Sequence, residues 1–74
     1  MIVVTGGAGF IGSAFVWQCN RQGRDDILVV DHLASTEKWK NLVPLRFADY
    51  LDRAAFLERI ESERIDGIEA IVHL

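Results

Sequence analysis

The stretch Thr5-Gly6-Gly7-Ala8-Gly9-Phe10-Ile11-Gly12 is the part of this sequence that decides the fold. It follows the β-branched run 2–4 and precedes a segment with helical periodicity, so it joins a buried strand to a helix. Its glycines can be read as Gly6-x-x-Gly9-x-x-Gly12 or as Gly7-x-Gly9-x-x-Gly12. In a strand–turn–helix context, such spacing is typical of loops that hold the diphosphate of a dinucleotide.

Each glycine of this loop has an expected role. Gly6 permits the sharp turn off the strand, Gly9 lets backbone approach a phosphate, and Gly12 lets the helix pack closely on the sheet. The main-chain N–H groups of Phe10 and Ile11 would point at the phosphates from the positive end of the helix. The alternative is a tight glycine turn that holds no ligand. No Gly-Lys-Ser/Thr follows, which excludes the Walker phosphate loop.

Strands and helices alternate along the rest of the chain. Apolar residues at helical spacing predict a helix from about residue 10 to residue 22, capped by Gly23. Further strands are expected at 27–30, ending at Asp31, and at 45–48 and 68–74, with a loop over 32–43. A second helix, capped by Asp52, would end near Arg64. The core-facing helix residues are expected to be Ile11, Phe15, Cys19, Phe56, Leu57 and Ile60.

This order predicts an α/β fold, a Rossmann-type parallel sheet with flanking helices and the strand order 3-2-1-4. The 74 residues are about half of a typical domain of roughly 150 residues, and 50% of them are hydrophobic. We therefore expect residues 1–74 to be the N-terminal part of an NAD(P)-binding Rossmann domain, its first half, with no second domain.

Composition and charge exclude several classes of partner. The formal net charge is −3 and the basic residues are scattered, so no nucleic-acid or membrane surface is expected. One cysteine excludes an internal disulfide and fits a cytoplasmic protein. We expect no signal peptide, and no apolar run approaches the roughly 20 residues that a membrane span needs.

Asp31 stands where a dinucleotide-binding fold places a carboxylate, roughly 20 residues after the last glycine of the loop. There it would accept hydrogen bonds from the adenosine ribose and favour NAD over NADP. The alternative is a solvated carboxylate at a strand end. Lys38, Lys40 and Arg53 could each offset Asp31 and hold a 2′-phosphate, or be ordinary surface charges. Spacing alone leaves the choice between NAD and NADP open.

The opening Val4-Thr5-Gly6-Gly7-Ala8-Gly9-Phe10-Ile11-Gly12-Ser13 resembles the extended short-chain dehydrogenase/reductases that act on nucleotide sugars, the NAD-dependent epimerase/dehydratase family. The segments 26–33 and 41–52, with a short interval between Asp31 and Asp49, are similar to the branch of that family that epimerises an ADP-heptose for lipopolysaccharide core synthesis. The resemblance covers essentially all 74 residues.

The resemblance implies a tightly held NADP that serves inversion of the heptose C6 carbon. It implies a nucleotide-sugar substrate and, for the full-length protein, a homo-oligomer. Phe10 and Ile11 would contact the diphosphate, Asp31 and His32 the adenosine ribose, and Lys38 and Arg53 the 2′-phosphate. His32 stands where the family has Asn and Arg53 where it has Lys; both side chains still donate hydrogen bonds.

The family's catalytic Tyr-x-x-x-Lys and its assisting Ser/Thr are expected beyond Leu74. The one tyrosine is Tyr50, and no lysine follows it at the required spacing. We expect no catalytic residue and no metal site in these 74 residues. Two alternatives stay open: an NAD-dependent sugar-nucleotide 4-epimerase, dehydratase or reductase fragment, and a non-catalytic nucleotide-binding module.

Three further residues carry expectations of their own. Cys19 is expected to be a buried apolar side chain of the first helix. His73 would end the fourth strand and point toward the cofactor crevice, with or without a contact to the cofactor. Asp49 would end the third strand, close enough to approach the adenine edge.

Overall fold

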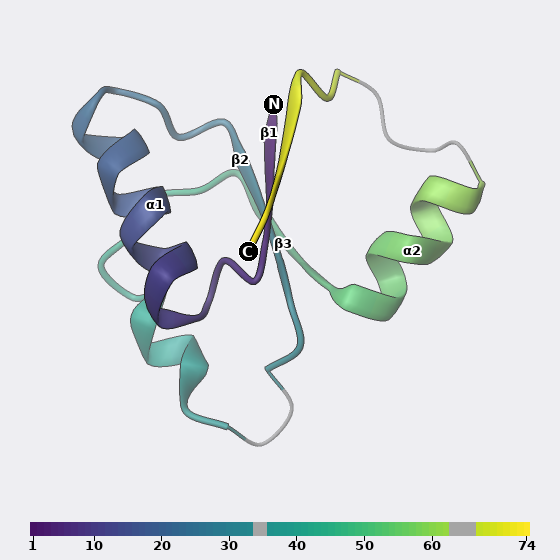
Figure 1. The fold of residues 1–74 in the computed structure, drawn as a ribbon, viewed down its shortest axis with the longest axis horizontal. Helices are drawn as coiled ribbons and strands as arrows, with labels where there is room; N and C mark the ends of the chain where they lie inside the picture. The colour runs from purple at the N-terminus through teal and green to yellow at the C-terminus, as the bar shows by residue number, and fades with distance from the viewer. Residues whose placement is uncertain (34–35, 63–66) are drawn as a thin grey trace.

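A computed structural model describes residues 1–33, 36–62 and 67–74. Strands and helices alternate in it along the chain (Figure 1). In chain order they are β1 (Ile2–Thr5), α1 (Phe10–Arg21), β2 (Ile27–Asp31), the 3₁₀ helix η1 (Lys38–Asn41), β3 (Asp49–Asp52), α2 (Arg53–Glu61) and β4 (Ala70–His73).

The strands form one parallel sheet in the order β3-β2-β1-β4, which confirms the predicted topology. β1 lies between β2 and β4, and Thr5 at its end pairs with Val30 and with His73. Asp31 at the end of β2 pairs with Asp52 at the end of β3. The carboxyl ends of all four strands therefore meet at one edge, where parallel sheets of this kind bind ligands.

Helices cover both faces of the sheet, with α1 and η1 on one side and α2 on the other (Figure 1). Successive side chains of a strand point to opposite faces, so β1 and β2 supply both halves of the core. The core on the α1 side consists of Val4, Ala8, Val16, Ile27, Val29 and Leu42. The core on the α2 side consists of Val3, Leu28, Val30, Leu51 and Phe56. Burial on both faces explains why β2 is apolar at consecutive positions.

The third strand is not where the sequence pattern placed it. The predicted strand at 45–48 is wrong, because β3 begins at Asp49. Leu45 and Phe47 are partly buried against the α1-side core from an irregular segment. Their alternation reflects that packing and resembles the alternation of a strand. The backbone joins the sheet through Ala48, whose N–H donates to the Ile27 carbonyl at 2.9 Å.

The predicted helix ends agree with the structure where it describes them. Past the end of α1, Gly23 has φ +83°, and the N–H groups of Gly23 and Arg24 donate to Asn20 and Cys19, which is a Schellman motif. Asp52 caps α2 by accepting from the Ala54 N–H at 3.1 Å, as predicted. The expected end near Arg64 lies outside the described residues, and the described helix reaches Glu61. Strand β4 spans four residues, fewer than the predicted range 68–74.

Three apolar side chains predicted to face the core are exposed instead: Ile11 (69%), Leu57 (54%) and Ile60 (42%). Phe56 alone is buried from α2, with Ala55 partly buried beside it. Ile11 and Leu57 line a cavity at the sheet edge rather than packing on the sheet. Cys19 is partly buried against the α1-side core, as expected for an apolar role. Among the described helices, none has the length and apolar character to cross a membrane.

Candidate functional site

A cavity of about 760 Å³ opens at the carboxyl edge of the sheet. This volume is within the range of sites for small molecules and cofactors, roughly 300–1,000 Å³. All nine residues predicted to bind a cofactor line it, namely Gly6, Gly9, Phe10, Ile11, Gly12, Asp31, His32, Lys38 and Arg53. Six more line it as well: Thr5, Val30, Phe56, Leu57, His73 and Leu74. The structure thus brings the predicted set together at one place.

Gly6 and Gly12 are required in this segment for different reasons. Gly6 has φ +72°, in the left-handed region, and a Cβ there would lie 2.9 Å from the carbonyl oxygen of Leu74. At Gly12 a Cβ would lie 2.8 Å from the Cα of Gly7 and closer still to the Gly6 carbonyl oxygen. Gly12 therefore lets α1 pack against the turn itself, rather than against the sheet as predicted.

The N-terminus of α1 faces the cavity with unoccupied main-chain donors. Its cap residue Gly9 offers no side-chain hydrogen bond, and the first turn holds no acidic residue. The N–H of Ser13 donates to Gly9 at 2.9 Å, so the N–H groups of Phe10 and Ile11 lie before the first helical bond. The Phe10 residue is 87% exposed. Such a terminus suits an anion.

The Asp31 carboxylate is buried and accepts several hydrogen bonds. Oδ2 accepts from the Ala8 N–H at 2.9 Å, while Oδ1 accepts from the His32 N–H at 2.7 Å and from the Lys38 ammonium at 3.2 Å. Burial alone would raise the pKa of Asp31, but the bonds from His32, Lys38 and Ala8 outweigh it and hold that pKa below its ordinary value. Asp31 is thus an ionised group bound to the glycine loop.

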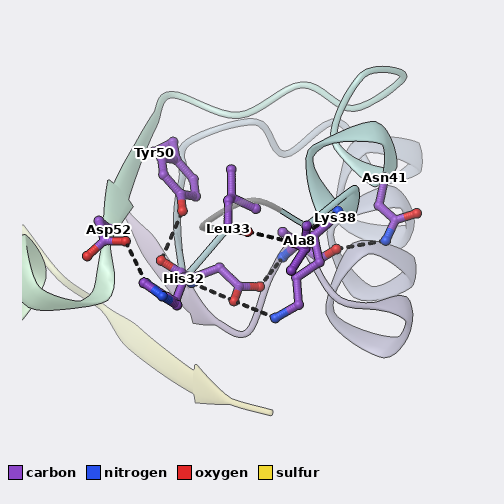
Figure 2. A network of polar contacts seen from close by, with 9 residues as sticks. Ala8, His32, Leu33, Lys38, Asn41, Tyr50 and Asp52 are labelled. Carbon is purple, nitrogen blue, oxygen red and sulfur yellow. Dashed lines mark hydrogen bonds and ion pairs between the residues drawn. The ribbon is translucent and has the colours of Figure 1, made fainter.

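The charged groups at the ends of β2 and β3 form a second set of contacts. His32 Nδ1 lies 3.2 Å from Asp52 Oδ1 (Figure 2). The backbone hydrogen bond from Ala54 and the contact with His32 lower the pKa of the Asp52 carboxyl. Arg53 follows at the start of α2 and lines the cavity, as Lys38 does from η1. Two cationic side chains and one imidazole therefore line the same cavity as Asp31, and one of them, Lys38, contacts its carboxylate.

The structure gives Tyr50 and Asp49 positions away from the cavity lining. The Tyr50 hydroxyl donates to the Asp31 main-chain carbonyl at 2.9 Å, and burial, followed by the charges of Asp52 and Asp31, raises its pKa. Asp49 begins β3, pairs with Leu28 and accepts from the Tyr50 N–H. The expectation that Asp49 ends its strand near an adenine is therefore wrong, because β3 lies four residues further along the chain.

Sequence reasoning missed part of the cavity wall. Thr5 follows the apolar run at the end of β1, and its hydroxyl lies 2.7 Å from Nδ1 of His73 at the end of β4. The position of Thr5 immediately before Gly6 could have identified it as a residue of the cavity wall. His73 does reach the crevice, as expected. Phe56 and Leu57 carry no such signal, since helical periodicity does not distinguish a cavity wall from a core.

The parallel sheet in the order β3-β2-β1-β4 defines a Rossmann-like α/β fold, and its carboxyl edge holds a glycine turn, an open helix N-terminus and a carboxylate at the end of the second strand. The chain matches the NAD dependent epimerase/dehydratase family over residues 2–74, and it belongs to that family.

Its relatives include proteins named ADP-L-glycero-D-manno-heptose-6-epimerase. The chain is 49% identical over 75 residues to the one from Nitratidesulfovibrio vulgaris (strain DP4), 47% to that of Fusobacterium nucleatum and 51% to that of Alkalilimnicola ehrlichii. Each comparison covers 100% of this chain and 23% of the relative. The chain therefore spans about a quarter of the length of these relatives.

Proposed function

We propose that this chain is the NADP-binding segment of an epimerase that inverts C6 of ADP-D-glycero-D-manno-heptose for lipopolysaccharide core synthesis. The observation that carries the proposal is the convergence of all nine predicted cofactor residues on one cavity. The substrate follows from the names of relatives at 47–51% identity. A homo-oligomeric state of the full-length protein belongs to the same proposal.

The glycine turn fits a dinucleotide diphosphate. The N–H groups of Phe10 and Ile11 precede the first helical bond of α1 and would donate to the phosphate oxygens. Close packing of Gly12 on Gly6 brings that helix end to the floor of the cavity. The first turn carries no acidic side chain that would repel an anion.

The Asp31 carboxylate fits one ribose hydroxyl. A carboxylate offers about four acceptor positions, and Ala8, His32 and Lys38 take three of them. The remaining position is on Oδ2. Since the ionised Asp31 carboxylate is paired with the Lys38 ammonium and bonded to the loop, its charge opposes a 2′-phosphate less than an unpaired carboxylate would.

Lys38 and Arg53 would hold the 2′-phosphate and so favour NADP over NAD. Both line the cavity, one from η1 and the other from α2, and Lys38 also contacts Asp31. His32 adds an imidazole at the same end, fixed through its contact with Asp52. Charge-assisted hydrogen bonds to a phosphate are roughly twice as strong as neutral ones, which supports NADP.

When bound, the nicotinamide supplies the hydride exchange by which the sugar carbon is oxidised and reduced again on its other face. The contribution of this chain is binding and orientation. The exposed side chains of Phe10 and Ile11, with Leu57 opposite, form apolar walls of the cavity. Such walls exclude water from the bound dinucleotide.

Calorimetry with the 74-residue chain tests the binding half of this proposal. We expect NADP to bind at least tenfold more tightly than NAD, and Lys40→Ala to leave both affinities unchanged, since Lys40 pairs with Glu37 outside the cavity. Equal affinities would contradict the NADP assignment and favour the NAD-dependent alternative. Failure to bind either nucleotide would overturn the proposal.

A chimera tests the catalytic half. The chain replaces the matching segment of the Nitratidesulfovibrio vulgaris relative, to which it is 49% identical. NMR then follows inversion at C6 of ADP-D-glycero-D-manno-heptose. We expect turnover within about tenfold of the intact relative. A folded chimera that binds NADP and does not turn over would contradict the assignment to a heptose epimerase.

A further inference from the structure

The main-chain N–H and the main-chain carbonyl of Ala8 each form a hydrogen bond with a side chain from another part of the chain. The Ala8 N–H donates to Asp31 Oδ2 at 2.9 Å, and the Ala8 carbonyl accepts from the Asn41 side-chain amide at 2.8 Å (Figure 2). The Ala8 side chain is fully buried in the α1-side core. Ala8 is therefore the anchored point of a loop that is otherwise rich in glycine.

Asn41 owes its position to η1. Leu42, the next residue, is buried in the α1-side core and donates its N–H to the Trp39 carbonyl at 3.1 Å. Lys38, at the other end of η1, reaches Asp31 at 3.2 Å. One short helix thus supports both partners of Ala8, since it supplies Asn41 directly and holds Asp31 through Lys38.

A loop of this composition needs such support. Glycine loses more conformational freedom on ordering than any other residue, and Gly6, Gly7 and Gly9 surround Ala8. Without a fixed Ala8, the N-terminal turn of α1 would have to be ordered when a ligand binds, at a cost in affinity. The two hydrogen bonds to Ala8 order this turn before a ligand binds.

We propose that Asn41 is a positioning residue for the diphosphate. It does not line the cavity; it acts through the Ala8 carbonyl and holds the loop from Gly6 to Gly12 in its binding shape. This inference rests on the proposed function, because it takes the diphosphate to be the ligand of the glycine loop. The 3₁₀ helix η1 would thus contribute to diphosphate affinity through Asn41, in addition to the charge that Lys38 provides.

Two substitutions remove the contact with little other change. Asn41 is itself exposed, so Asn41→Ala opens no cavity, and Asn41→Asp keeps the size while it removes the donor. Lys40→Ala is the matched control, since Lys40 lies in the same 3₁₀ helix and pairs with Glu37 at 3.2 Å. Amide dispersion in NMR spectra reports whether each variant is folded.

The probes are ADP, which carries a diphosphate, and 2′-AMP, which carries a phosphate at the Lys38–Arg53 end and no diphosphate. We expect both Asn41 variants to bind ADP roughly three- to tenfold more weakly, the range of one hydrogen bond, and 2′-AMP within twofold of the parent chain. Hydrogen exchange at Ala8 in the free protein should accelerate relative to exchange at Val29.

Each other outcome overturns the inference. Unchanged ADP affinity and unchanged exchange would show that Asn41 does not hold the loop. Equal losses for ADP and 2′-AMP, or an unfolded variant beside a folded Lys40→Ala, would show a general structural role. A parent chain that binds 2′-AMP but not ADP would overturn the proposed function at the glycine loop, and this inference with it.

Discussion

Asp31 and Ala8 are 23 positions apart in the sequence, and the carboxylate of the first accepts the main-chain N–H of the second at 2.9 Å. This bond links the end of β2 to the glycine turn after β1, the two segments whose side-by-side position defines the cavity. It also gives Asp31 a role in the absence of a ligand, since the residue that faces the ribose in folds of this kind is here part of the loop's own support.

The Asp31–Ala8 bond predicts an acid-sensitive contribution to stability. The pKa of Asp31 in the folded chain is below its ordinary value of about 3.9, so the ionised carboxylate stabilises the fold above that pH, and the contribution is lost as pH falls through the lower pKa. Asp31→Asn should lower the free energy of unfolding at pH 7 by about 1–3 kcal/mol. Its loss of stability on acidification should be smaller than that of the parent chain.

Urea titrations from pH 7 to pH 2 measure this effect, with the Ala8 amide proton shift as the local reporter. Asp25→Asn, at an exposed position on the loop before β2, is the control. Parallel pH curves for the parent chain and Asp31→Asn would disprove the role given to this carboxylate.

Among substitutions in the glycine loop, we expect Gly12→Ala to lower the free energy of unfolding most. A Cβ at this position meets the backbone of Gly6 and Gly7, which cannot move aside as a side chain would. Gly12→Ala should therefore destabilise the chain by about 3 kcal/mol or more, at the upper end of overpacking effects. Gly23→Ala should cost about 1–2 kcal/mol, because Gly23 has φ +83° but open space around it. Equal urea midpoints for the two variants would be inconsistent with the close approach of α1 to the turn.

Lys38 and Arg53 predict the cofactor preference. Replacing either by Ala should weaken NADP roughly tenfold and NAD less than threefold, because only NADP presents a 2′-phosphate. Isothermal calorimetry of both nucleotides measures the split, with Lys40→Ala as the charge-matched control. Equal losses for NAD and NADP would mean that neither side chain distinguishes the 2′-phosphate, and Asp31 would then indicate NAD.

Strand β4 predicts self-association of the 74-residue chain. It is an edge strand of the sheet, and Ile71 and Leu74 are 53% and 50% exposed. Exposed apolar edges pair with other chains, so sedimentation should show association that rises with concentration. Ile71→Lys should reduce it, while Ile60→Lys, on the exposed surface of α2, should not. A monomeric parent chain with a cooperative melt at high temperature would contradict this expectation.

The sheet order and the part of the cavity formed by the glycine loop and Asp31 followed from local sequence signals. The turn at Gly6, the continuous burial of β2 and the cap at Asp52 each depend on a few neighbouring residues whose chemistry permits one arrangement. Parallel connections then bring the ends of those strands to one edge, which is why residues as distant as Gly9 and Asp31 could be assigned to one site, whereas His32, Lys38 and Arg53 were assigned to it from the family resemblance.

The remaining differences arise from contacts between segments distant in sequence. Leu45 and Phe47 alternate because both reach the α1-side core, and only the register with β2 shows that the strand begins at Asp49. Ile11 in α1 and Leu57 in α2 each fall at helical spacing with other apolar residues. That spacing does not show whether the side chain packs on the sheet or lines the cavity. The contact of Asn41 with Ala8 joins residues 33 positions apart and leaves no local pattern.

If the glycine loop binds the dinucleotide diphosphate, an NMR titration of the 74-residue chain with NADP will show it at the loop amides. We expect saturable amide shift changes that are largest at Gly9, Phe10, Ile11 and Gly12, with a second group at His32, Lys38 and Arg53. Saturation without changes at the loop amides, or no binding by a folded chain, would contradict it.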